Sequence, residues 1–222
     1  MPRQLEAEGL VLDRKQAGEN HLRLTLLSPT LGIVLALTRE SRPAGATPSS
    51  SKKTRSAPQR PDIFDHASVL LEVRDDGDAH SNIYFLREYK IIRRHAGLGR
   101  SYAALEAASG IATLVAHNAK HFETCAPVFD LCKKALDALD TGASPEAVRL
   151  KTLFILAKAE GYAAQEQWLP GLSAADQTLA LAILNHPAAE AAALAADDTS
   201  RLPKLRQTFE RWLERHTDIE LK

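Results

Sequence analysis

The sequence contains few of the residues on which several classes of protein depend. Only two cysteines occur among its 222 residues, Cys125 and Cys132, which argues against a disulfide framework and a four-cysteine zinc site. Aromatic residues make up 5% of the chain, so few side chains are present to stack on nucleic-acid bases. No run approaches the ~18 apolar residues that a membrane span requires, and the charged first residues lack the apolar core of a signal peptide. We therefore expect a protein of the reducing cytoplasm that is neither secreted nor anchored.

Catalytic motifs and net charge are missing as well. The chain has no phosphate-binding glycine loop, no G-x-S-x-G and no H-E-x-x-H. Its 28 Lys and Arg balance its 28 Asp and Glu, so the molecule as a whole is not a polycation. Any electrostatic function must come from an uneven distribution of charge along the chain. The content of 45% hydrophobic and 25% charged residues is enough for one large or two small domains.

One acidic cluster resembles a metal loop in part. Asp75, Asp76 and Asp78 lie with Gly77 in the segment RDDGD. Carboxylates of this spacing occur in calcium loops, but acids and glycine are also the ordinary residues of a turn between two strands. We interpret the segment as a hairpin connection.

The most metal-like cluster consists of His117, His121, Glu123 and Cys125. Two histidines one helical turn apart can share one ion. However, the helix is predicted to end near Asn118, which removes the shared face, and histidine is common in last turns because it interacts well with the helix dipole. We therefore expect no metal, and we expect Cys132 to be a small hydrophobic residue on its helix. The alternative hypothesis that the chain is an enzyme would rest on this cluster alone.

Apolar residues with a period of two fill the chain as far as about Leu86. Leu22, Leu24 and Leu26 alternate with polar residues, which is typical of a half-buried strand. Strands are expected at 9–12, 22–28, 31–38, 66–73 and 82–86. Without a convincing helix in this part, the pattern favours a small antiparallel barrel or sandwich.

From about Tyr102 the apolar residues follow a helical period instead. Pro127, Ser144 and Ser173 are good helix starts, and Gly161 and Pro187 are good stops. Helices are expected at 102–118, 127–139, 145–161 and 173–187, with another beginning after Thr199 or Ser200. The last helix places one apolar face inward, made of Leu202, Leu205, Phe209, Trp212 and Leu213. The second half is therefore predicted to be a helical bundle.

Between the two groups of expected strands, within residues 34–61, lies a tract rich in Pro, Ser, Lys and Arg, in which only Glu40 is acidic. We call it the basic tract. Its composition is that of a linker. A passive linker does not require so many cations, and each cation that reaches a phosphate adds salt-dependent affinity. Three further cations on neighbouring strands extend the same patch. The candidates for phosphate contacts are Arg14, Lys15, Arg23, Arg39, Arg42, Lys52, Lys53, Arg55 and Arg60.

Three segments of the chain carry short sequence motifs, and these segments follow one another in a definite order. GLVLDRKQAGENHLRLTLLSPTLGIVLALTRESR joins a G-hydrophobic-V-L strand, a G-E turn, a T-L strand, a glycine and a basic segment. Its matching residues are Gly9, Val11, Leu12, Gly18, Glu19, Leu24, Thr25, Leu26, Gly32, Arg39 and Arg42. The second segment is YFLREYKIIRRHAGLGRSYAALEAAS, and the third, LRQTFERWLERHTDIELK, ends in a tail carried by His216, Leu221 and Lys222. In this order the segments resemble the RecO family of recombinational DNA repair proteins over nearly the full chain.

The resemblance implies an α+β chain in two domains. Residues 1–86 would form an OB-fold β-barrel with a flexible basic loop at 43–61, and residues 87–222 an all-helical C-terminal domain. Family members bind single- and double-stranded DNA, anneal complementary strands, and act with RecR and the acidic tail of single-strand-binding protein to load RecA. The resemblance also implies no catalytic centre, no cofactor and a cytoplasmic, nucleoid-associated location.

The chain departs from the family pattern at several places. Many RecO proteins carry a four-cysteine zinc module after a G-Y pair, whereas Gly161 and Tyr162 here lead directly towards the next helix, so no zinc is expected. The acidic residue that often follows the G-E turn is replaced around Asn20 and His21. With the neutral net charge, these departures leave an alternative open. The chain would then be a protein-interaction adaptor of the same fold that binds RecR or single-strand-binding protein through its helical domain and has little DNA affinity.

Overall fold

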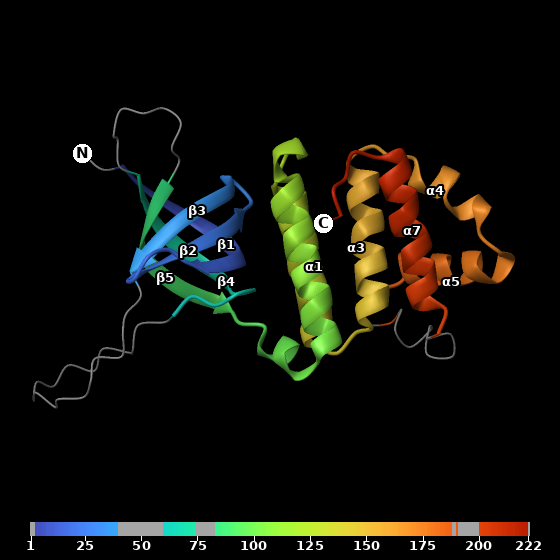
Figure 1. The fold of residues 1–222 in the computed structure, drawn as a ribbon, viewed down its shortest axis with the longest axis horizontal. Coiled ribbons are helices and arrows are strands. Elements are labelled where there is room, and N and C mark those ends of the chain that lie inside the picture. Colours follow the sequence, from blue (N-terminus) through green and yellow to red (C-terminus); the bar gives the residue numbers. More distant parts are fainter. Residues whose placement is uncertain (1–2, 40–59, 74–82, 188–189, 191–199, 222) are drawn as a thin grey trace, which may run out of the picture. The chain divides into compact units, whose positions relative to one another are not determined.

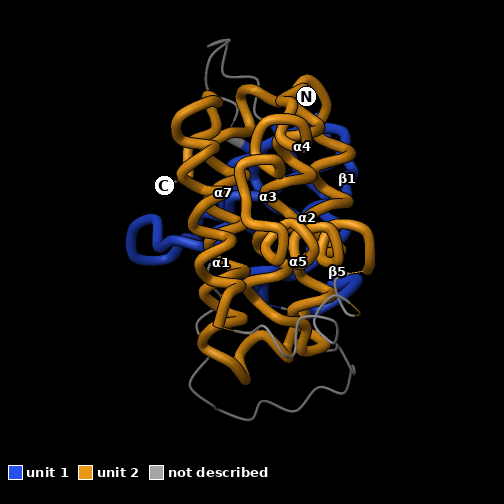
Figure 2. The backbone as a smooth tube through the Cα atoms, turned by 90° about the vertical axis from the view of Figure 1, so that its right-hand side faces the viewer, with its two compact units in different colours: residues 1–94 blue, residues 95–222 orange. Residues whose placement is uncertain are grey.

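The computed structural model of the chain describes residues 3–39, 60–73, 83–187, 190 and 200–221. The chain divides into two compact units, a barrel unit of residues 1–94 and a helical unit of residues 95–222 (Figure 2). The expected order of strands followed by helices is confirmed, and the chain is of the α+β class. Three segments lie outside the described residues: most of the basic tract, the acidic segment RDDGD that is expected to be a turn, and most of the alanine-rich segment after Pro187.

The barrel unit contains five strands in the order β1-β2-β3-β5-β4, and the sheet closes on itself because β1 also pairs with β4 (Figure 1). The strands are β1 (Arg3–Gln16), β2 (His21–Ser28), β3 (Gly32–Arg39), β4 (His66–Val73) and β5 (Ile83–Arg93). Neighbours are antiparallel except β3 and β5, which run parallel. The expected antiparallel pairing is therefore wrong for this one pair, which joins strands that are distant in sequence.

Alternation along β2 and β3 decides which side chains enter the barrel. Leu24 and Leu26 of β2 are buried in one hydrophobic cluster with Val34 and Ala36 of β3. The register places Leu24 opposite Ala36 and Leu26 opposite Val34, so the inward side chains meet in pairs. Each fully buried leucine contributes about 1.5–3 kcal/mol to folding. Arg23, between two inward residues, is exposed on the outer face.

The β1–β2 and β2–β3 turns have glycine at positions where the backbone is left-handed. Gly18, between β1 and β2, has φ of 76°, and Gly32, at the start of β3, has φ of 71°. These values lie in the left-handed region, which side chains with a Cβ rarely adopt. The side-chain amide of Gln16 donates to the carbonyl oxygen of Gly18 at 3.0 Å and holds the first turn.

The domain boundary expected at Leu86 is wrong. β5 continues to Arg93, and the two compact units divide between Arg94 and His95. Leu86 therefore lies within a barrel strand, and the following residues up to Arg94 belong to the barrel unit.

A bulge in β5 explains why the period of two stops early. Leu70 and Leu71 of β4 are consecutive, yet their partners in β5 are separated by Arg87, which has no partner in the register. Leu86 and Tyr89, on either side of the bulge, both pack against the barrel core. The extra residue shifts the inward positions, so the sequence pattern no longer alternates although the strand continues.

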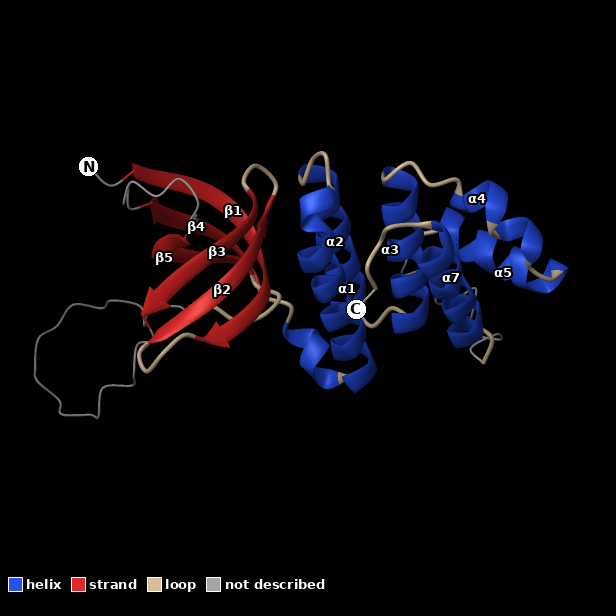
Figure 3. Ribbon diagram, turned by 45° about the horizontal axis from the view of Figure 1, so that its top comes forward, coloured by secondary structure: helices blue, strands red, loops and turns tan. Residues whose placement is uncertain are grey.

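The helical unit follows the expected helices closely (Figure 3). Its helices are α1 (Tyr102–Asn118), α2 (Ala126–Asp140), α3 (Pro145–Ala159), α4 (Ala164–Gln167), α5 (Ala174–Asn185) and α7 (Leu202–His216), with short 3-10 turns η1 (Ala96–Arg100), η2 (Ala119–His121) and η3 (Leu169–Gly171). The hydroxyls of Ser101, Ser144 and Ser173 accept from backbone N–H groups of the first helical turns, as expected for N-caps. α4 and η3 are short elements that the sequence pattern does not indicate.

The core of the helical unit is built around α3 and α7. The predicted apolar face of α7 is buried. Phe209 of α7 lies 5.7 Å from Phe154 of α3 and 4.7 Å from Trp168, measured between ring centroids. Such tilted aromatic pairs add to the free energy of area burial. None of the helices described for this chain is both long enough and apolar enough to cross a bilayer.

Candidate nucleic-acid interface

Cations gather on the outer face of β1, β2 and β3, at the end next to the β1–β2 turn. Lys15 of β1 lies directly opposite Arg23 of β2, and His21 of β2 lies opposite Arg39 of β3. Because residues directly opposite each other share one side of a sheet, and because His21 and Arg23 are two apart, all of these side chains lie on the same face. We call Lys15, Arg23 and Arg39, with His21 between them, the cationic face.

The charges of the cationic face are mostly uncompensated. Lys15 Nζ lies 2.8 Å from a carboxylate oxygen of Asp13, and the lysine side chain is 62% exposed. Exposed pairs of this kind contribute only about 0–1 kcal/mol, so Lys15 can exchange this partner for another anion. Arg23 and Arg39 are exposed and have no ion-pair partner among the residues that the structure describes. Like charges directly opposite each other on a sheet repel. An anion bound between Lys15 and Arg23 would therefore offset the repulsion between these two side chains.

Apolar side chains continue the outer face beyond the cations. Thr25 lies opposite Leu35, which is 40% exposed, and Arg23 lies opposite Leu37. The parallel pairing of β3 and β5 places Phe85 beside Leu37. The outer face therefore combines cations at one end with apolar and aromatic surface next to them, which is the combination that nucleic-acid backbones and bases require.

Sequence reasoning missed Phe85 as a candidate contact. Tyr84 and Leu86 pack against the barrel core, so the residue between them points to the outer face. The alternation of YFL contains this signal, but only the pairing of β5 with β3 brings Phe85 beside the cationic face.

The remaining predicted cations are not part of this face. Arg14 lies opposite Leu24, which is an inward position, and its guanidinium is 3.4 Å from the carboxylate of Asp62. Arg60 is exposed near the same aspartate, two residues before it in sequence. Four further candidates lie outside the described residues, namely Arg42, Lys52, Lys53 and Arg55. The structure therefore brings together Lys15, Arg23 and Arg39 and separates them from Arg14.

An ionic network around the buried carboxylate of Asp65 fixes the chain where the basic tract returns to the barrel. Asp65 is 1% exposed and accepts hydrogen bonds from Arg94 at 2.7 and 2.8 Å and from the hydroxyl of Tyr89 at 3.0 Å. The Arg94 guanidinium also donates to the carbonyl oxygen of Arg60 at 2.9 Å. Hydrogen bonding to Asp65 raises the pKa of Arg94, and burial, together with the Asp65 charge, raises the pKa of Tyr89 well above its usual range. Both side chains therefore stay protonated as donors to Asp65.

The backbone beside this network is held in an unusual conformation. Phe64 has φ of 66°, a left-handed value that is costly for a bulky residue. Its N–H donates to the carbonyl oxygen of Val11 at 2.8 Å, and the N–H of Val11 donates to the carbonyl oxygen of Asp65 at 2.9 Å. These bonds to β1 and the burial of the Phe64 ring hold the turn in place. Together with the Asp65 network, they position the described end of the basic tract against the barrel.

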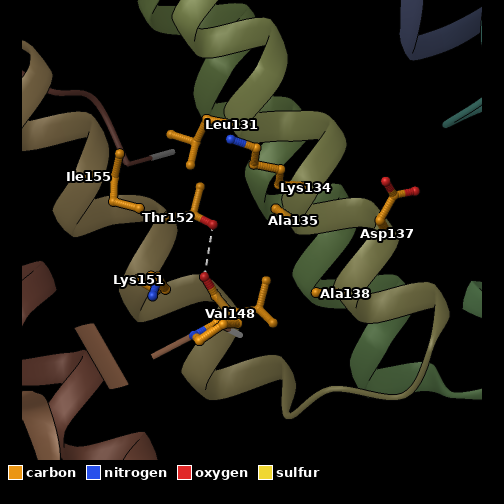
Figure 4. Close-up of a pocket in the computed structure, with 10 residues that line it drawn as sticks. Leu131, Lys134, Ala135, Asp137, Ala138, Val148, Lys151, Thr152 and Ile155 are labelled. Atoms are coloured by element: carbon orange, nitrogen blue, oxygen red, sulfur yellow. Dashed lines mark hydrogen bonds between the residues drawn. The ribbon is translucent and has the colours of Figure 1, made fainter. Parts of the chain in front are cut away.

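A cavity of about 370 Å³ lies between α2 and α3 (Figure 4). Leu131, Ala135 and Ile155 line it, and the Thr152 hydroxyl on its wall donates to the carbonyl oxygen of Val148 at 2.8 Å. The cavity is apolar, and its described lining offers no pairing of a nucleophile with a base.

Lys151, which also lines the cavity, is held at the end of α5. Its ammonium donates to the carbonyl oxygens of Ile183 at 3.2 Å and Leu184 at 3.0 Å, and to that of His186. Burial lowers the pKa of Lys151. Because these donors satisfy the last carbonyl groups of α5, the lysine caps that helix.

The residues of the predicted metal-like cluster are not gathered into a site. α1 ends at Asn118 as expected, and His121 lies in the following 3-10 turn. Within the described ranges, no group of three or more His, Cys, Asp or Glu side chains could hold a metal ion. Cys132 is buried in α2 as predicted, and burial raises the pKa of its thiol to about 12. A thiol of that pKa is not a nucleophile at neutral pH.

No family model matches the chain, and no curated protein matches it.

Proposed function

We propose that the chain is a RecO-like, non-enzymatic protein that binds DNA and anneals complementary strands in recombinational repair. The observation that carries this proposal is the strand register, which brings Lys15, Arg23 and Arg39 onto one exposed face. A row of separated cations matches the phosphates of a nucleic-acid strand, because the negative charges of the phosphates repeat along the strand. The proposal extends to single- and double-stranded DNA, since both present that backbone.

The topology of the barrel unit supports an OB-fold. The strand order β1-β2-β3-β5-β4 and the parallel β3–β5 pair describe a small five-stranded barrel. In OB-folds the face of strands 2 and 3, with the loop that joins strands 1 and 2, binds oligonucleotides. The cationic face lies on β2 and β3 beside the β1–β2 turn, in agreement with that mode of binding.

The chemistry of annealing requires no catalytic group. Two complementary strands repel each other through their phosphates, and cations that neutralise some of that charge lower the barrier to pairing. Exposed lysine and arginine contact the backbone without reading the bases. A surface of this kind can hold one strand while its bases remain accessible to the other.

The proposed partners and location are those that the resemblance to the RecO family implies. We propose that the chain acts with RecR and single-strand-binding protein to load RecA, in the cytoplasm at the nucleoid. The alternative is a protein-interaction adaptor with little DNA affinity, and the apolar cavity between α2 and α3 favours it. An apolar side chain of a partner would enter this cavity, and exposed Lys134 at its rim would meet an acidic group.

A salt titration of DNA binding tests the proposal. Binding of a labelled single-stranded oligonucleotide should weaken with salt, with a slope of about −2 in log affinity against log salt if Lys15, Arg23 and Arg39 each reach one phosphate. The double variant Arg23→Ala, Arg39→Ala should have a lower affinity and a salt slope that is smaller by about 1.4. The matched control is Arg3→Ala with Lys90→Ala, which removes equal charge from exposed positions of the barrel outside the cationic face. If both double variants bind like the unchanged chain, the adaptor is the better explanation.

A further inference from the structure

A second pocket, of about 330 Å³, lies in the helical unit between the α4–η3 segment and the last turns of α7. Its walls include Trp168, Arg211, Trp212, Arg215 and His216. Positions 208, 212 and 215 of α7 follow the helical period, so this part of α7 turns one side towards the pocket. The pocket is separate from the cavity between α2 and α3 and shares no lining residue with it.

Stacked rings form one wall of this pocket. The imidazole of His216 lies 5.3 Å from the indole of Trp212 at an angle of 15°, and Trp212 in turn stacks on Phe209 at 5.7 Å and 9°. The Nδ1 atom of His216 is 2.9 Å from the carbonyl oxygen of Trp212, and donation from Nδ1 holds the imidazole over the indole. Trp212 is 9% exposed whereas His216 is exposed, so the imidazole is the outermost ring of a supported stack. A flat ligand can continue the stack on it.

Cations surround the stacked rings. Arg211 and Arg215 are exposed and lie one helical turn apart on α7. The Nε of Arg211 donates to the carbonyl oxygen of Gln207 at 3.3 Å, and Arg215 has no ion-pair partner in the described part of the chain. Like charges at this spacing repel, and no acidic residue is among the described residues of the pocket walls. The walls therefore favour an anion, for which two planar guanidinium groups are suited.

The geometry points to a binding site for one nucleotide of single-stranded nucleic acid, with its base on the His216 ring and its phosphate between Arg211 and Arg215. A flat ring surface with adjacent cations is the arrangement that binds single strands without sequence preference. A volume of about 330 Å³ lies within the size range of small-ligand pockets. The inference rests on the proposed nucleic-acid function and gives it a base-stacking contact in the helical unit.

Intrinsic fluorescence provides a direct probe of this pocket. The chain has two tryptophans, Trp168 and Trp212, and both line the pocket. We expect dTMP, and more strongly an oligo-dT strand, to quench the tryptophan emission of the full chain, because a base stacked on His216 adjoins the Trp212 stack. An absence of quenching by oligo-dT at concentrations that saturate binding would overturn the inference.

Matched variants separate stacking from charge. His216→Ala should weaken oligo-dT binding about fivefold or more, whereas His216→Phe, which keeps a flat ring, should retain most of the affinity. Arg211→Ala with Arg215→Ala should weaken binding more than Lys158→Ala with Lys204→Ala, which removes equal charge from exposed positions outside the pocket. Equal losses in the two double variants would show that only overall charge matters and would contradict the inference.

The outcomes also separate this site from the cationic face of the barrel. If Arg23→Ala with Arg39→Ala abolishes binding while the pocket variants bind normally, the pocket inference fails and the proposed function stands. If only the pocket variants lose affinity, the barrel site fails. Quenching by an acidic peptide in the absence of quenching by oligo-dT would assign the pocket to a protein partner and overturn the nucleotide site.

Discussion

Lys15 and Arg23 lie directly opposite each other across β1 and β2, on the outer face of the barrel. Like charges at such positions lower the stability of a sheet, and a charge of opposite sign there raises it. Arg23→Glu should therefore increase the free energy of unfolding by about 0.2–1 kcal/mol while it weakens DNA binding. Urea denaturation and oligonucleotide titration on the same preparation measure the two effects. A variant that is less stable, or that binds DNA unchanged, would contradict the role given to this pair.

Asp65 should be the most sensitive charged residue of the barrel unit. Asp65→Asn removes the buried negative charge and replaces one of its two acceptor oxygens with an amide group that cannot accept. The hydrogen bonds from Arg94 and Tyr89 cannot all be kept, and we expect a loss of about 2–3 kcal/mol in the free energy of unfolding. Tyr89→Phe removes one of the hydrogen bonds to Asp65 and should cost about 1 kcal/mol. Urea denaturation, followed by a signal of the barrel unit, tests the order of these losses. Equal losses for the two variants would show that the Arg94 contact contributes little.

Two glycines of η1 provide a matched pair for steric crowding. A Cβ on Gly97 would lie 2.3 Å from the carbonyl oxygen of Asp140, whereas a Cβ on Gly99 would meet no atom within 4 Å. Gly97→Ala should lower the free energy of unfolding by about 1–3 kcal/mol, because neither the backbone of Asp140 nor the N–H of Gly97 that bonds to its carboxylate can move independently. Gly99→Ala should leave the melting temperature nearly unchanged. Similar melting temperatures for both variants would contradict the close contact between Gly97 and Asp140.

The two thiols should differ in reactivity. Burial raises the pKa of Cys132 to about 12, so this thiol stays protonated as the pH rises to 10 and reacts only as the pH approaches that value or when the chain unfolds. Cys125 is partly exposed, and burial raises its pKa as well, so it should react slowly at pH 8. A thiol-reactive chromophore should therefore label one cysteine in the native protein and both in denaturant. Labelling of both in the native protein would show that α2 opens readily.

Much of the fold follows from local sequence patterns, and the exceptions have structural causes. The alternation of β2, β3 and β4 and the caps Ser144 and Ser173 lead to nearly the correct bounds. The end of β5 does not, because the bulge at Arg87 interrupts the period that identifies a strand. The parallel pairing of β3 with β5 depends on residues distant in sequence, and no local pattern contains it.

The candidate sites show the same division. The outward orientation of Arg23 and Arg39 follows from the alternation of their strands, whereas the position of Lys15 opposite Arg23 depends on the register between β1 and β2. The stack of His216 on Trp212 lies on one helix, one turn apart, but its role as a pocket wall depends on the packing of the α4–η3 segment against α7. Sequence patterns therefore identify the chemical groups better than they identify which groups meet.

The parallel pairing of β3 and β5 has a consequence for synthesis on the ribosome. The β2–β3 hairpin is complete in the nascent chain long before β5 emerges, so the outer edge of β3 has no partner during translation of residues 40–82. An unpaired strand edge is a site of aggregation, and charged residues beside it discourage pairing with other chains. The first segment to follow β3 is the basic tract, whose like charges repel the same tract on a neighbouring nascent chain. The cations of the basic tract, which the sequence makes candidates for phosphate contacts, would thus also protect the unfinished chain.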